Sequence, residues 1–139
     1  MNSQKVKQQN QNLSAVVFTE IRGSLILTFP QSQHLSNAQC QLIQQETLTR
    51  CAQRKQTAVI FDLSALTMID LTEWHWFRQL GQSIRLMGSQ AWFVGIQPTI
   101  IMTLVHLDAK TQDQNYALGV EEALSFVEEA SPLVSASVE

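Results

Sequence analysis

The chain has 139 residues, of which 45% are hydrophobic and 15% charged, and its formal net charge is -3 at pH 7. This length fits one domain with a single core, since a typical domain has roughly 100 to 150 residues. The basic residues are scattered, which argues against nucleic-acid binding. No stretch reaches the roughly 18 apolar residues of a membrane helix, and the N-terminus lacks the layout of a signal peptide. We therefore expect a cytoplasmic protein that is not inserted into a membrane.

Two β-rich runs follow a polar tail at residues 1–13, which we expect to be disordered in isolation. The runs span residues 15–18 and 25–29, and Gly23 between them can supply the positive φ of a hairpin turn. The folded domain is therefore predicted to begin with two antiparallel strands.

The next two elements are a helix and a buried strand. Pro30 ends the second strand, and Ser36 can cap a helix that runs to Arg54. The continuous apolar run over residues 57–61 is typical of a strand buried on both faces, so we expect it to be central in the sheet.

Both cysteines, Cys40 and Cys51, lie in this predicted helix. At about 1.5 Å per residue they are roughly 16 Å apart, whereas a disulfide needs Cα atoms within about 7 Å. No CxxC or HxxxH spacing accompanies them, so we interpret them as buried thiols that act as small hydrophobic side chains.

The second half of the chain alternates helices and strands. Asp70 and Glu73 have the spacing of a capping box, and the helix that they begin runs through Met87. Gly88 is placed to close this helix as its C-terminal cap. A second buried strand is predicted over residues 91–96.

A further helix begins near Pro98, which suits a first helical turn. Its predicted lining residues are Ile100, Ile101, Leu104, Val105 and Leu107. Residues 116–118 form a short predicted strand and residues 120–129 a last helix, followed by a flexible tail at residues 131–139. This alternation implies crossover connections and one α/β domain over residues 14–130.

Four segments, together with the order of the elements, carry a resemblance to a known family. They are Asp62-Leu63-Ser64-Ala65-Leu66, Ile69-Asp70, Arg85-Leu86-Met87-Gly88 and Val94-Gly95-Ile96-Gln97-Pro98. Over residues 15–129 the chain resembles the STAS family, which comprises the anti-sigma-factor antagonists and their relatives, and especially the small STAS-only scaffolds of bacterial stressosomes. The resemblance implies the α/β STAS fold, with a mixed sheet of four to five strands and four helices packed on it.

The resemblance also implies a non-enzymatic signalling scaffold that needs no cofactor. In such systems the scaffold co-assembles with larger sensor paralogues that carry the same STAS domain, and the assembly holds a GHKL-type serine kinase. Phosphorylation of the scaffold releases the kinase, and a phosphatase resets the system. We therefore expect a large homo- or hetero-oligomeric complex that acts in a bacterial stress response.

The same resemblance implies two phosphate acceptors. One lies two residues after Asp62, which is Ser64 in this chain. The other lies directly after Asp70, where this chain has Leu71. Leucine cannot accept a phosphate, so the switch has either moved to Ser64 or Thr72 or been lost. A phosphate at this helix start would be attracted by backbone N–H groups and repelled by the neighbouring carboxylates.

Helical geometry predicts which side of this helix meets solvent. At about 100° per residue, Leu71 points roughly 160° away from an apolar stripe made of Phe77, Leu80, Ile84 and Met87. Trp74 lies near the side of Leu71, which predicts an exposed apolar patch that requires a partner. The predicted partner-binding residues are Asp62, Asp70, Leu71, Trp74, His75 and Arg78. The alternative is that Leu71 and Trp74 fold beneath the turn at residues 65–69.

Three other functions fit parts of the sequence. A free-standing anti-sigma-factor antagonist would bind its kinase one to one, and a STAS accessory subunit of a lipid transporter would accompany an ATPase. A hydrolase could use Asp62 and Asp70 as acid and base, but the sequence offers no nucleophile, glycine-rich phosphate loop or metal set beside them. The histidines, His34, His75 and His106, share no metal-binding spacing.

Overall fold

A computed structural model of the chain describes residues 16–31 and 35–130. The predicted tails at residues 1–13 and 131–139 lie outside this part. The elements, in chain order, are β1 (Val17–Ile21), β2 (Ser24–Thr28), α2 (Asn37–Gln53), β3 (Ala58–Asp62), α3 (Leu71–Leu86), β4 (Gln90–Val94), α4 (Pro98–His106), β5 (Asn115–Ala117) and α5 (Val120–Glu129).

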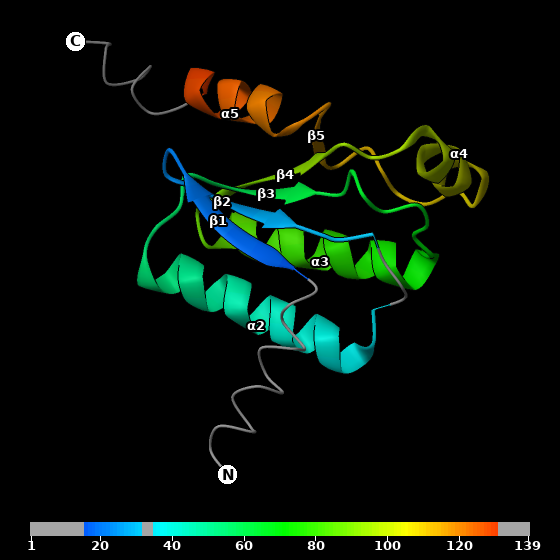
Figure 1. The fold of residues 1–139 in the computed structure, drawn as a ribbon, viewed down its shortest axis with the longest axis horizontal. Coiled ribbons are helices and arrows are strands. Elements are labelled where there is room, and N and C mark those ends of the chain that lie inside the picture. Colours follow the sequence, from blue (N-terminus) through cyan, green and yellow to red (C-terminus); the bar gives the residue numbers. More distant parts are fainter. Residues whose placement is uncertain (1–15, 32–34, 131–139) are drawn as a thin grey trace.

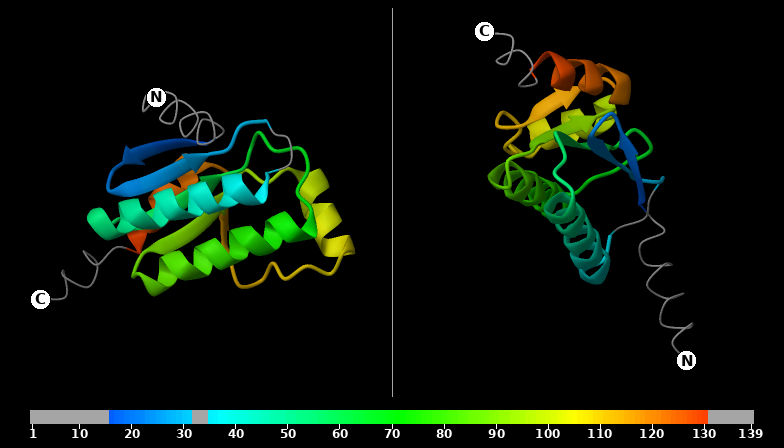
Figure 2. Two further views of the ribbon diagram at one scale, coloured as in Figure 1. Left: turned by 90° about the horizontal axis from the view of Figure 1, so that it is seen from below. Right: turned by 90° about the vertical axis from the view of Figure 1, so that its left-hand side faces the viewer.

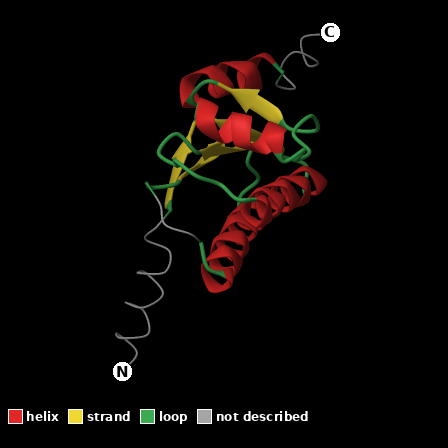
Figure 3. Cartoon of the chain, turned by 90° about the vertical axis from the view of Figure 1, so that its right-hand side faces the viewer, coloured by secondary structure: helices red, strands yellow, loops and turns green. Residues whose placement is uncertain are grey.

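The strands form one mixed sheet in the order β1-β2-β3-β4-β5. β1 is antiparallel to β2, and the other neighbours are parallel. Helices α2 and α3 cover one face, α5 covers the other, and α4 crosses the end of the sheet (Figures 1, 2 and 3). These findings confirm the predicted α/β class, the mixed sheet and the central place of β3.

The first hairpin turns more tightly than the sequence indicated. β1 extends to Ile21, and only Arg22 and Gly23 connect it to β2, with φ values of 50° and 79°. A two-residue turn with both φ angles positive matches the twist of the paired strands. Arg22 also binds Glu121 and Glu128 of α5, at 3.1 and 3.4 Å, so the turn is joined to the helix on that face.

Both predicted helix caps are confirmed. The Ser36 hydroxyl accepts a hydrogen bond from the backbone N–H of Gln39 at 3.1 Å. At the start of α3, the Asp70 carboxylate accepts from the N–H of Glu73 at 2.7 Å, and Glu73 accepts from the N–H of Asp70 at 3.0 Å. Gly88 follows the C-cap of α3 with φ 95°, as a closing residue in the left-handed region should.

The main core contains a cluster of aromatic rings between the sheet and α3. Phe61 stacks on Phe93 of the next strand, with ring centroids 4.8 Å apart. Phe77 of α3 meets Phe29 edge to face at 5.2 Å. Such pairs add about 0.5–1.5 kcal/mol each beyond the area they bury, so the cluster holds α3 firmly on β3 and β4.

The buried face of α3 differs from the predicted stripe. It consists of Trp74, Phe77, Leu80, Gly81 and Ile84, whereas Met87 is 41% exposed. The reason is Gly81, where an added Cβ would lie 3.6 Å from Phe93 and 3.7 Å from Ala91. The helix approaches β4 closely at this glycine. Trp74, two turns earlier on the same side, is therefore drawn into the core.

Helix α4 also differs from its predicted packing. Ile100 and Leu104 are buried, but Ile101, Val105 and Leu107 are exposed. Because α4 crosses the end of the sheet instead of lying flat on a face, only one narrow side of it meets the core (Figure 3).

As predicted, the two cysteines do not form a disulfide with each other, but only one of them is fully buried. Cys40 and Cys51 are both free thiols, and Cys51 is buried while Cys40 is half-buried. Burial raises the pKa of each thiol, and for Cys40 the charge of Glu73 raises the pKa further.

Candidate functional site

The end of β3 forms a tight turn around one carboxylate. Asp62 Oδ1 accepts hydrogen bonds from the Ser64 backbone N–H at 3.1 Å and from the Ser64 hydroxyl at 2.7 Å. An aspartate that bonds the backbone two residues on is a common stabiliser of such turns. Asp62 therefore caps the turn, and Ser64 presents its side chain at the surface.

The segment after β4 supports this turn from the other side. Gly95 has φ 73°, and an added Cβ would lie only 2.8 Å from Ser64 Cβ and 3.1 Å from Ser64 Cα. The Gln97 side-chain amide donates to the Ser64 carbonyl at 3.0 Å. Neither Gly95 nor Gln97 was predicted to have a role of its own, although the Gly-Ile-Gln-Pro motif directly after a strand was a signal for one.

The start of α3 completes what we call the β3–α3 corner, made of Asp62, Ser64, Asp70, Leu71 and Thr72. Asp70 caps the helix, and Leu71 and Thr72 are exposed. Leu71 is 45% exposed, which confirms that it faces outward. The acceptor position implied by the family resemblance thus holds an exposed apolar side chain.

The prediction that Trp74 forms an exposed patch with Leu71 is wrong. Trp74 is only 2% exposed, and its ring lies 5.6 Å from that of Phe93. Its indole N–H donates to the carbonyl of Lys110 at 2.8 Å. The alternative of burial holds for Trp74 but not for Leu71, because the close approach of α3 at Gly81 turns Trp74 toward the sheet.

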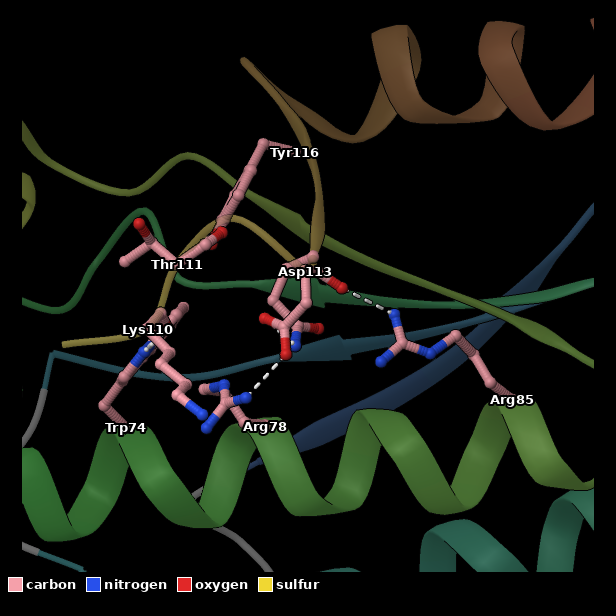
Figure 4. A network of polar contacts seen from close by, with 8 residues as sticks. Trp74, Arg78, Arg85, Lys110, Thr111, Asp113 and Tyr116 are labelled. Atoms are coloured by element: carbon pink, nitrogen blue, oxygen red, sulfur yellow. Dashed lines mark hydrogen bonds and ion pairs between the residues drawn. The ribbon is translucent and has the colours of Figure 1, made fainter.

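Arg78, which was also predicted to bind a partner, is mostly buried and forms an ion pair within the domain. Its side chain is 14% exposed and pairs with Asp113 at 2.5 Å. Arg85 donates to the Asp113 carbonyl at 3.0 Å. The indole N–H of Trp74 donates to a carbonyl earlier in the same connection, which joins α4 to β5. Figure 4 shows these side chains reaching from α3 to the connection before β5. His75, by contrast, remains on the surface.

This network shifts two ionisation equilibria. The hydrogen bond from Arg78 lowers the pKa of Asp113 to about 2. Burial raises the pKa of Tyr116 to about 12, and the nearby charge of Asp113 adds to that effect. At neutral pH the Asp113 carboxylate is therefore charged, while the Tyr116 hydroxyl keeps its proton and donates to the Thr111 carbonyl at 2.5 Å.

The remaining candidate ligands do not converge. His75 lies in α3 and His106 at the end of α4, and His34 falls outside the described residues. Within residues 16–31 and 35–130, no group of three or more His, Cys, Asp or Glu side chains is placed to hold a metal ion. In the same part of the chain, no helix combines the length and the apolar character needed to cross a membrane.

Comparison with known proteins identifies the family. The STAS domain profile matches residues 14–123. The chain belongs to the STAS domain family. Over 97 residues it is 31% identical to the RsbT co-antagonist protein RsbRC of Bacillus subtilis, a match that covers 66% of this chain and 34% of that relative. This STAS chain thus spans about a third of the length of that curated relative.

Solved structures share the STAS fold. RsbS from Moorella thermoacetica superposes with a TM-score of 0.70 at 17% identity, covering 82% of this chain and 95% of that one. A chain of the stressosome, described as a signal integration and transduction hub, gives a TM-score of 0.67 at 16% identity, covering 81% and 96%. At these identities the likeness establishes the fold alone.

The contact between Gly95 and Ser64 predicts a specific loss of stability. Gly95→Ala should lower the free energy of unfolding by about 2–4 kcal/mol, since strain at a positive φ costs roughly 1–2 kcal/mol and the clash adds to it. Gly88→Ala is the matched control, because Gly88 also has a positive φ but an added Cβ meets nothing within 4 Å. Urea unfolding of both variants measures the difference, and equal losses would contradict the contact.

The Arg78–Asp113 pair predicts a pH dependence of stability. A carboxyl with a lowered pKa stabilises the fold above its ordinary pKa of 3.8, and this stabilisation is lost as the pH falls toward 2. Because Asp113 is 43% exposed, solvent screening limits the effect of Asp113→Asn at pH 7 to roughly 1 kcal/mol. The difference from the native chain should shrink between pH 4 and 2 in urea unfolding, with Asp108→Asn as the charge control. A difference independent of pH would refute this role.

Proposed function

We propose that the chain is a non-enzymatic STAS scaffold of a stressosome-type signalling complex. It assembles in the cytoplasm with sensor paralogues that carry the same domain, and it binds a GHKL-type serine kinase. The observation that carries this proposal is the exposed apolar start of α3 at Leu71, on a corner whose two aspartates are engaged in caps. Kinship with a protein named an RsbT co-antagonist supports the same class of function.

The corner has the composition of a contact surface and not that of an active site. Leu71 of the corner is 45% exposed, and Met68, two residues before Asp70, is 76% exposed. Large exposed apolar side chains that gather on one part of a soluble domain commonly mark an interaction site. The carboxylates of Asp62 and Asp70 hold backbone N–H groups, so their geometry serves the turn and the helix start. We therefore assign the corner to recognition of a protein partner.

We further propose that this corner is not switched by phosphorylation. Leu71 offers no hydroxyl, and the Ser64 hydroxyl is bonded to Asp62. A phosphate on Ser64 would meet that carboxylate, and one on Thr72 would meet the neighbouring acidic side chains of the cap, which repel it. A phosphatase would then act on other members of the complex.

Assembly is the direct test of the scaffold proposal. Leu71→Glu places a charge in the proposed contact and should abolish formation of a large particle when the chain is co-expressed with an RsbR-type paralogue from the same genome. Burying an unpaired carboxylate in an interface costs several kcal/mol, enough to prevent association. Size-exclusion chromatography with light scattering gives the mass of each mixture.

Leu86→Glu is the matched control, because Leu86 is 89% exposed at the opposite end of the same helix. It should leave assembly intact. A small complex of fixed mass formed by the native chain would instead indicate a free-standing antagonist. Loss of assembly in both variants would contradict a contact centred on Leu71.

Restoration of the acceptor tests the proposed loss of the switch. After incubation with the GHKL-type kinase encoded in the same genome and ATP, mass spectrometry should find phosphate on the Leu71→Ser variant and none on the native chain. The side chain at position 71 is exposed, so a serine there would be accessible to the kinase. Phosphate on Ser64 or Thr72 of the native chain would show that the switch has moved. No phosphate on either protein would count against this kinase as a partner.

A further inference from the structure

An apolar cavity of about 400 Å³ lies beside the β3–α3 corner, between α3, α4 and the end of the sheet. Its wall is mostly apolar and includes Trp74, Phe93, Gly95, Ile101, Val105 and Leu118. Sites for small molecules commonly measure roughly 300–1,000 Å³ and combine such apolar walls with few polar groups. The cavity also lies at the carboxyl ends of parallel strands β4 and β5, where open α/β sheets bind ligands.

The polar groups of the wall are few and mostly engaged. The Tyr116 hydroxyl donates to the Thr111 carbonyl, and Glu122 accepts a hydrogen bond from the Leu118 N–H at 2.9 Å. Glu122 is the charged residue of this wall. Its carboxylate repels an anion, and the apolar remainder offers a charged group no partner. The wall therefore disfavours anions and suits a molecule with a large apolar part.

The outer wall of the cavity is the exposed helix α4. Ile101 and Val105 border the cavity while being 48% and 66% exposed, so they separate it only partly from solvent. Leu118, 85% exposed, borders it from the connection between β5 and α5. These side chains form an entrance that a ligand would cover, which would remove their apolar surface from water.

We propose that this cavity is a binding site for a small uncharged apolar molecule, such as a medium-chain alcohol, and that binding of this molecule displaces the turn at Ser64. Gly95 borders the cavity and also touches Ser64, and Gln97, two residues on, donates to the Ser64 carbonyl. A ligand that moves Gly95 therefore displaces the turn. The site needs no partner protein, so its test is independent of the proposed scaffold function.

Titration of the full-length chain with 1-octanol, followed by ¹H–¹⁵N correlation spectra, tests the site. We expect saturable shifts of the Gly95, Ala117 and Leu118 amides, with the amides of α2 unchanged. Octanoate, which has a similar chain but a negative charge, should bind at least tenfold more weakly because of Glu122. The Ser64 amide and the Gln97 side-chain amide should shift together with Gly95. No shift at these two groups would refute the coupling.

Two tryptophan substitutions on α4 separate the cavity from the surface. Ile101→Trp adds volume at the cavity wall and should abolish the octanol shifts. Met102→Trp is the control, because Met102 is 70% exposed and does not border the cavity. Both positions are exposed, so the fold should survive, as circular dichroism can verify. Absence of saturable binding by the native chain, or equal binding by both variants, would overturn the site. Concentration-dependent broadening of the same amides without octanol would show instead that a second copy covers it.

Discussion

Strand β3 is buried on both faces and paired along both edges, and the rest of the domain depends on this constraint. Residues 58–61 are fully buried. Because β3 runs parallel to β2 and β4, the chain must leave and return by crossovers, which places α2 and α3 on the sheet. The same pairing brings Asp62 level with Val94. The turn after β3 and the turn at Gly95 therefore meet, and the corner and the cavity both form where they touch.

Features with local causes could be predicted from the sequence. The caps at Ser36 and Asp70 depend on side chains reaching three residues along the chain, and the hairpin depends on the positive φ available to Gly23. The burial of Trp74 could not be predicted in the same way. A helical wheel predicts the buried side from the apolar side chains of the helix. The position of α3 instead depends on Gly81, whose lack of a side chain lets the helix approach β4 closely. Packing across the sheet thus decided which side of the helix is buried.

In the candidate site, too, features with local causes could be predicted from the sequence, and features that depend on tertiary packing could not. The outward direction of Leu71 was predicted from its place opposite the expected apolar stripe, and it holds although the buried face is shifted toward Trp74. The Asp62 cap follows from its place at a strand end. The salt bridge between Arg78 and Asp113 joins residues 35 apart in the sequence, and no local pattern indicates it. The cavity draws its wall from residues between Trp74 and Glu122, which belong to α3, β4, α4, β5, α5 and the segments between them. Such features become visible only in three dimensions.

The two parts of the corner differ in what holds them. Leu71 begins a helix whose start is fixed by the reciprocal bonds of Asp70 and Glu73. Ser64 is held by Asp62 on one side and by the segment of Gly95 on the other, and that segment also borders the cavity. A ligand changes an equilibrium only through contacts that differ between two states. A molecule in the cavity can therefore act on the Ser64 turn while the proposed apolar contact at Leu71 stays in place, so the proposed assembly and the response to a ligand can be separate properties of one small domain.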